Sequence, residues 1–197
     1  MKYKKEGEQL KRFMALLTLI SVIAILTACS SEPSLELTNK KVEIIDDKER
    51  LGSMILQQGD KAGTEAEYTA LYYTFSIKNT GNRTIGNVNE PLKAKIEPNE
   101  KLVTVSEEVM GFNIFNTEEY SETGLGHGEN AEGILKPNTE GKFTLNYLLG
   151  INIETDEVLF VPSNEQLEKL EDIALDATLI VMLGDKEIAR FDLSEKK

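Results

Sequence analysis

From residue 35 onward, the dominant period of apolar and polar residues is two, the pattern of strands with one buried face. The clearest case runs from 68 to 78, where Leu71, Tyr73, Phe75 and Ile77 alternate with polar neighbours. Further strands are expected at 35–45, 54–56, 92–96, 102–105, 143–147, 158–161, 178–183 and 186–193. Residues typical of turns separate these stretches, and Gly184-Asp185 between the last two fits a tight hairpin.

One segment, 163–174, has the spacing of an amphipathic helix, with Leu167, Leu170 and Ile173 on one face. Ser163 and Gln166 fit a capping box at its start. Residues 117–133 contain four glycines and are expected to form a long polar loop. The chain from residue 35 is therefore predicted to be mostly β, an antiparallel β-sandwich with one short helix.

The N-terminus follows a different pattern. Five basic side chains precede sixteen uncharged residues, 13–28, and these lead to Cys29, the only cysteine of the chain. A basic segment, an apolar segment and small residues at a cleavage site make an export signal. The run Leu26-Thr27-Ala28-Cys29 resembles the lipobox of bacterial lipoproteins. This resemblance implies cleavage between Ala28 and Cys29, and a diacylglyceryl group, with acyl chains such as palmitate, on the Cys29 sulfur.

The chain is thus expected to divide into a signal peptide (1–28), a lipidated cysteine with its tether (29–34) and one domain (35–197). Lipid on Cys29 would hold the domain at the extracytoplasmic face of the cell membrane. The alternative is an uncleaved membrane anchor. However, a sixteen-residue helix spans about 24 Å, which is less than the ~30 Å of a bilayer's hydrocarbon core.

Removal of residues 1–28 would leave 17 basic and 32 acidic side chains, a formal charge of −15. Such a chain lacks the basic clusters that bind nucleic acid through its phosphates, so no nucleic-acid partner is expected. With its one cysteine lipidated, the domain would have no disulfide. Its stability must then come from the burial of side chains.

Three stretches of the chain carry a second resemblance. Residues 73–82 (YTFSIKNTGN), together with Leu135-Lys136-Pro137 and Phe143-Thr144-Leu145, resemble the immunoglobulin-like accessory domains of bacterial exported proteins. Combined with the lipobox, they make the chain similar to small lipoproteins of Gram-positive bacteria. The resemblance implies an immunoglobulin-like β-sandwich without catalytic residues. One departure is Asn138, where that group usually has glycine.

Candidate catalytic chemistry is sparse. The chain has one histidine, His127, and no Gly-x-Ser-x-Gly motif to present a nucleophilic serine. Pairs of carboxylates could serve a hydrolase of the envelope, but a chain with this many acidic residues offers such pairs anywhere. A binding or scaffolding role with a protein partner of the cell envelope, without a cofactor and without enzymatic activity, is therefore expected.

A cation or small-ligand sensor remains an alternative, because potential ligands crowd the 117–133 segment. They are Glu118, Glu119, Glu122, His127, Glu129 and Glu132. Carboxylates and an imidazole suit divalent metal ions, although the spacing matches no known calcium-binding loop. The competing interpretation is a solvated acidic loop with an exposed histidine.

Overall fold

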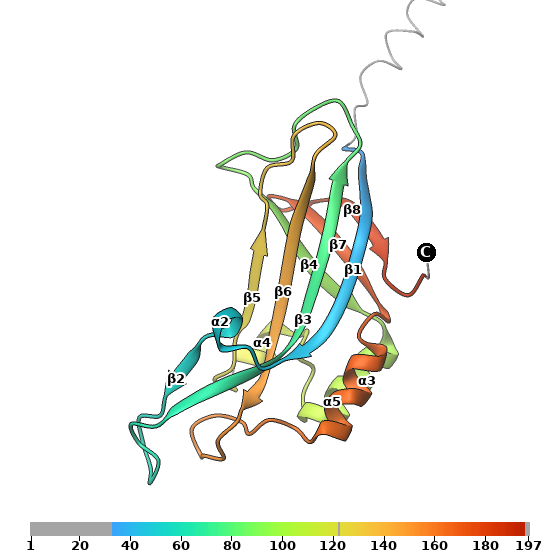
Figure 1. Cartoon of the computed structure of the whole chain (residues 1–197). Coiled ribbons are helices and arrows are strands. Elements are labelled where there is room, and N and C mark those ends of the chain that lie inside the picture. Colours follow the sequence, from blue (N-terminus) through green and yellow to red (C-terminus); the bar gives the residue numbers. More distant parts are fainter. Residues whose placement is uncertain (1–32, 122, 196–197) are drawn as a thin grey trace, which may run out of the picture. The chain divides into compact units, whose positions relative to one another are not determined.

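The computed structural model describes residues 33–121 and 123–195 (Figure 1). The described strands form two antiparallel sheets, which confirms the prediction of a mostly β chain. The larger sheet contains, in spatial order, β1 (Leu35–Ile45), β3 (Glu65–Asn79), β6 (Glu140–Ile151) and β5 (His127–Ala131), and β2 (Ser53–Ile55) also pairs with β3. The smaller sheet contains β4 (Leu92–Pro98), β7 (Ala177–Leu183) and β8 (Lys186–Asp192).

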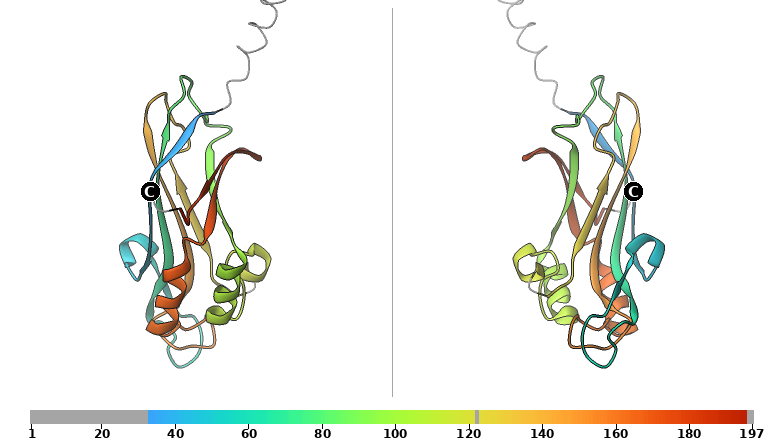
Figure 2. Two further views of the ribbon diagram at one scale, coloured as in Figure 1. Left: turned by 90° about the vertical axis from the view of Figure 1, so that its right-hand side faces the viewer. Right: turned by 90° about the vertical axis from the view of Figure 1, so that its left-hand side faces the viewer.

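The two sheets face each other and share one apolar core. Tyr73 and Phe75 of the larger sheet belong to the same buried cluster as Leu179 and Val181 of the smaller one. Figure 2 shows the two layers edge-on. Phe75 lies opposite Phe143 in the register of β3 and β6, and both side chains are fully buried. The alternation of apolar residues in these two strands therefore predicted the buried face correctly.

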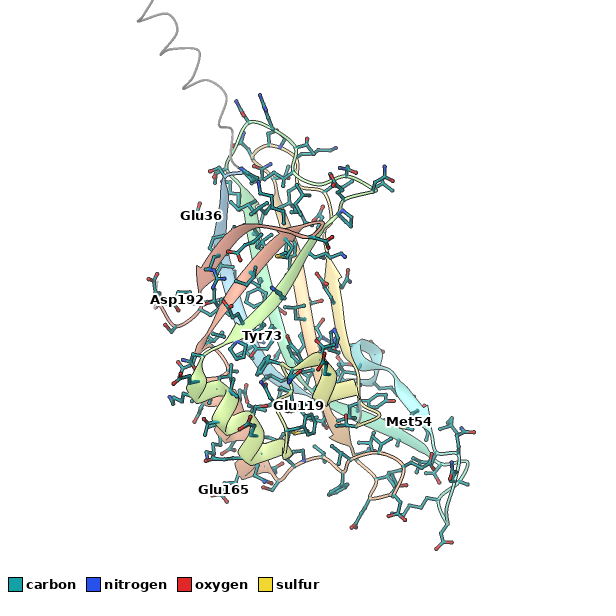
Figure 3. The ribbon with its side chains drawn as sticks, turned by 180° about the vertical axis from the view of Figure 1, so that it is seen from behind. Glu36, Met54, Tyr73, Glu119, Glu165 and Asp192 are labelled. Atoms are coloured by element: carbon teal, nitrogen blue, oxygen red, sulfur yellow. The ribbon has the colours of Figure 1, made fainter. Side chains whose placement is uncertain are left out.

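Helices extend the second layer beyond the smaller sheet. β4 leads into α3 (Glu100–Met110), and α5 (Asn164–Ile173) leads into β7, so both helices lie at one end of that sheet. They bury apolar side chains, among them Leu102, Leu167 and Leu170, in the common core. Tyr73 is labelled in Figure 3, and its hydroxyl donates to the carbonyl of Ala174, just after α5, at 2.9 Å. The helices thus cover the part of the larger sheet that the short strands do not reach.

The expectation of a strand at 102–105 is wrong, because these residues lie within α3. The Asn99 side chain accepts a hydrogen bond from the backbone amide of Leu102 and so caps the helix. Leu102, Val105 and Val109 then follow at helical spacing and are buried. The β-branched valines favour a strand by local preference, but the cap and the buried face decide the outcome.

Other expectations also need correction. The 117–133 segment is not one loop, since it contains α4 (Thr117–Ser121) and β5. A further short helix, α2 (Lys48–Leu51), follows β1, so the described chain has more than the one expected helix. The expected strand at 158–161 is reduced to an isolated parallel bridge between Phe160 and Ile151. The capping box of Ser163 and Gln166 and the β7–β8 hairpin are confirmed.

Candidate functional site: a groove between β1 and β8

The two sheets are joined on one side of the domain, where β5 meets β4. The amide of Leu92 donates to the carbonyl of Gly133 at 2.9 Å, and that of Ala94 donates to the Glu129 carboxylate at 2.5 Å. Gly86 approaches the same carbonyl so closely that an added Cβ would lie 2.1 Å from its oxygen. Main-chain and side-chain hydrogen bonds therefore close this side of the domain.

The opposite side, between β1 and β8, holds a groove of about 920 Å³. The left view of Figure 2 looks onto this side. The lining residues come from the first half of β1 and from the end of the chain, and are Leu35, Glu36, Leu37, Thr38, Asn39, Lys40, Thr178, Arg190, Phe191, Asp192 and Glu195. The groove is therefore lined by both apolar and charged side chains, drawn from β1, β8 and the end of the chain.

Lys40 links the two walls of this groove. Its ammonium group donates to the carbonyl oxygens of Leu193 and Glu195, each at 2.6 Å. A β-bulge between Leu37 and Asn39 makes this link possible. Because the bulge adds one residue, Lys40 pairs with the buried Phe75 and faces the inter-sheet space, whereas strict alternation would turn it outward.

The charges of the groove are fixed by local hydrogen bonds. Arg190 pairs with Glu187 and Glu97, and these bonds raise the pKa of its guanidinium. The hydroxyl and amide of Ser194 hold the pKa of Asp192 below its usual range. The lining contains three acidic and two basic side chains, so the groove carries a small negative excess.

The candidate metal ligands do not form one cluster. Glu118 and Glu119 lie on α4, whereas His127 and Glu129 lie on β5. The Glu119 carboxylate accepts hydrogen bonds from the Asn113 amide and the Asn116 side chain, at 3.1 and 2.5 Å. Glu132 follows β5 and is exposed, and Glu122 lies outside the described residues. Within 33–121 and 123–195, no three His, Cys, Asp or Glu side chains are grouped as a metal would require.

His127 is exposed and lies against an aromatic group. Its ring centroid is 6.2 Å from that of Tyr120 and 6.3 Å from that of Tyr147. The Tyr120 hydroxyl lies within hydrogen-bonding distance of the carbonyl oxygens of Gly126 and Leu148, which fixes the ring beside β5 and β6. These contacts give His127 a packing role at the edge of the larger sheet.

The predicted site residues at the N-terminus, Ala28 and Cys29, lie outside the described residues. The tether is described from Pro33, and Ser34 is hydrogen-bonded to Thr80. Sequence patterns missed the β1–β8 groove because its walls are far apart in the chain, with 153 positions between Lys40 and Leu193. The one local sign was the polar run Thr38-Asn39-Lys40, which interrupts the alternation of β1 where the bulge occurs.

Compared with protein-family models, curated proteins and solved structures, the chain matches none of them. Within the described part of the chain, no helix is both long and apolar enough to cross a bilayer.

Proposed function

We propose that this chain is a lipid-anchored binding module on the extracytoplasmic face of a bacterial cell membrane, and that it holds a partner polypeptide in the β1–β8 groove. The observation that carries the proposal is the difference between the two sides of the domain. Hydrogen bonds close the β4–β5 side, whereas the β1–β8 side holds a groove of about 920 Å³. A depression of this size, lined by both apolar and charged side chains, suits a ligand segment.

The charge of the groove and of the whole domain favours a basic partner segment. The lining has an excess of carboxylates, and residues 29–197 have a formal charge of −15. Opposite charges on partner surfaces speed their encounter and exclude acidic competitors. Leu35 and Phe191 supply apolar contact surface beside those charges. We therefore expect an extended segment in which lysine or arginine alternates with apolar residues.

The lipid anchor is proposed from the sequence. The lipobox Leu26-Thr27-Ala28-Cys29 supplies the acceptor thiol, and two acyl chains hold a protein at a membrane because each buried CH₂ contributes ~0.8 kcal/mol. The proposal is one of binding rather than catalysis because the chain has a single histidine and no Gly-x-Ser-x-Gly motif.

We also assign the domain to the immunoglobulin-like sandwiches. Support comes from Asn79, a buried polar residue of the segment that carries the resemblance. Its side-chain amide donates to the carbonyls of Arg83 and Leu135 at 2.7 and 3.0 Å, and its oxygen accepts from the Gly81 amide at 3.0 Å. Asn79 thus connects the Asn-x-Gly segment to the Leu-x-Pro segment, and this gives a physical reason for the two to occur together.

Site-specific photo-crosslinking in intact cells tests the binding role. A photoreactive phenylalanine analogue replaces Phe191 in the groove or, as a matched control, the exposed Glu168 on α5 of the full chain. We expect a polypeptide adduct from the groove position and none from the control position. The same adduct from both positions, or from neither, would contradict the proposal.

A second variant shows whether the adduct depends on an open groove. Leu35→Trp enlarges an apolar side chain that lines the groove from the start of β1, where it pairs with the buried Asn79. The adduct at position 191 should be lost in this variant, while the melting temperature of the domain stays close to that of the wild type. An adduct that persists in the filled groove would show that the partner binds elsewhere.

A further inference from the structure

The start of the described domain is fastened to the connection between β3 and β4. The Thr80 amide donates to the carbonyl of Ser34 at 2.8 Å, and the hydroxyl groups of the two residues lie 2.7 Å apart. Ser34 is therefore a fixed point of the domain. Only four residues, 30–33, separate it from Cys29.

Chain geometry converts this fixed point into a limit on distance. Five residue steps join Cys29 to Ser34, and an extended chain advances at most ~3.3–3.6 Å per step, about 17 Å in all. A lipid on Cys29 would thus keep Ser34 within about 17 Å of the bilayer surface, with the hydrogen-bonded Thr80 beside it. We infer from this, on the basis of the proposed lipid anchor, that the connection 80–91 rests against the membrane lipid.

This connection presents an aliphatic side chain to its surroundings. Val88 is 88% exposed, the highest value among the large exposed apolar residues of the described chain. It lies in a turn that Asn87 holds together, because the Asn87 side chain accepts from the amides of Asn89 and Glu90 at 2.9 and 3.0 Å. Ile134, on the neighbouring connection before β6, is 39% exposed. A single exposed valine is ordinary, so the weight of this one comes from its place on the connection that is fastened to Ser34.

The neighbouring connection is held in place as well. Ile85 and Leu135 exchange backbone hydrogen bonds, both 2.9 Å long, so that connections 80–91 and 132–139 form one surface. Both lie at the end of the larger sheet to which β3 runs, opposite the helices (Figure 1).

Local charge permits this contact despite the acidity of the domain. Connection 80–91 has one basic and one acidic residue, Arg83 and Glu90, and connection 132–139 likewise has Lys136 and Glu132. Salt screens charges beyond a Debye length of ~8 Å at physiological ionic strength. Only the charges of these two connections, which sum to zero, therefore interact strongly with the bilayer surface. Acidic side chains lie at the other end as well, on α3, α4 and α5. Repulsion from an anionic surface would resist any tilt that brings those helices down.

The test attaches the domain to lipid chemically, so that it does not depend on acylation in the cell. The core of the domain lies entirely within residues 37–193, and the chain 29–197 has a single thiol, Cys29. That thiol couples to maleimide-bearing lipid in vesicles of phosphatidylcholine and phosphatidylglycerol. Because the chain has no tryptophan, Val88→Trp introduces the only indole. Phe160→Trp is the matched control, since Phe160 is 53% exposed and bridges to Ile151 at the opposite end.

Coupled Val88→Trp should show a blue shift of its emission and quenching by lipid with a nitroxide headgroup, and both should vanish without coupling. Coupled Phe160→Trp should show neither. In the unsubstituted domain, coupling should slow amide hydrogen exchange in 80–91 and leave 53–66 unchanged. If Val88→Trp stays as accessible to aqueous iodide as Phe160→Trp, and exchange in 80–91 is unaltered, the inference is wrong. That result would leave the lipoprotein proposal intact, whereas a failure of acyl labelling in cells would leave the vesicle result standing.

Discussion

Alkaline pH should unfold this domain through three buried tyrosines. Tyr73 is fully buried, and Tyr120 and Tyr147 are at most 9% exposed. Burial raises the pKa of each phenol well above its usual value, and the nearby Glu129 carboxylate raises the pKa of Tyr147 further. The perturbation is therefore a rise in pH through the range in which an unfolded tyrosine loses its proton, near pH 10.

The sign follows from the proton balance of the two states. Above pH ~10 the unfolded chain releases these three protons while the folded chain retains them, so the free energy of unfolding falls as pH rises. Below pH ~10 both states keep the protons and the stabilisation is fully present. Each proton that only the folded chain retains lowers the free energy of unfolding by ~1.4 kcal/mol per pH unit. Three such protons lower it by about 4 kcal/mol per pH unit. A domain with a stability of 5–15 kcal/mol would then unfold roughly 1–4 pH units above 10.

The assay follows tyrosinate absorbance and far-ultraviolet circular dichroism in one titration of residues 29–197. No tryptophan overlaps the absorbance signal. Absorbance from the three buried rings should appear together with loss of the sheet spectrum. In Tyr73→Phe, the free energy of unfolding should fall with pH about one third less steeply, because two buried phenols remain. Complete ionisation of all tyrosines with an unchanged sheet spectrum would refute the reasoning.

Four other outcomes are expected. Phe75→Ala and Phe143→Ala should each lower the free energy of unfolding in urea by ~3–5 kcal/mol, and a wild-type midpoint for both would contradict the shared core. Asn79→Ala should cost about 1–3 kcal/mol for each buried group left without a partner, whereas an unchanged melt would mean that water replaces the side chain. Cys29→Ser should abolish fatty-acid labelling and processing in cells, and processing at the same site would exclude the lipoprotein signal. Ca²⁺, Mn²⁺ and Zn²⁺ should leave the melting temperature unchanged, because a true site would gain ~2.7 kcal/mol at a hundredfold excess over its Kd. A shift that His127→Ala removes would restore the cation-sensor alternative.

Much of the β-structure could be predicted from alternation alone. β3, β4, β6 and the β7–β8 hairpin have apolar residues at every second position, and burial of one face requires that pattern. The α5 helix could be predicted because its cap and its apolar spacing are both local. α3 was missed although Asn99 and the spacing of Leu102, Val105 and Val109 were visible in the sequence.

The groove was beyond prediction from the sequence for a different reason. Its walls, the first half of β1 and the end of β8, become neighbours only through the packing of two sheets. The bulge that turns Lys40 toward Leu193 depends on the register with β3, which local alternation does not determine. The metal-site hypothesis rested on closeness along the chain, which does not guarantee closeness in space. Glu119 and Glu129 lie on different elements, and each carboxylate accepts a hydrogen bond from a different backbone amide, those of Asn113 and Ala94.

The hydrogen bonds of Lys40 also govern when the domain can be completed. They join residues 153 and 155 positions apart, so β1 can complete these contacts only after residues 193 and 195 have been added to the fold. Contacts this distant in sequence form late and slow the folding of β proteins. A chain still crossing the membrane from its N-terminus could build β1 and β3 but not the far wall of the groove. If the chain is exported from its N-terminus as proposed, the groove would be complete only after residue 195 has crossed the membrane, so a half-exported chain could not yet hold a partner there.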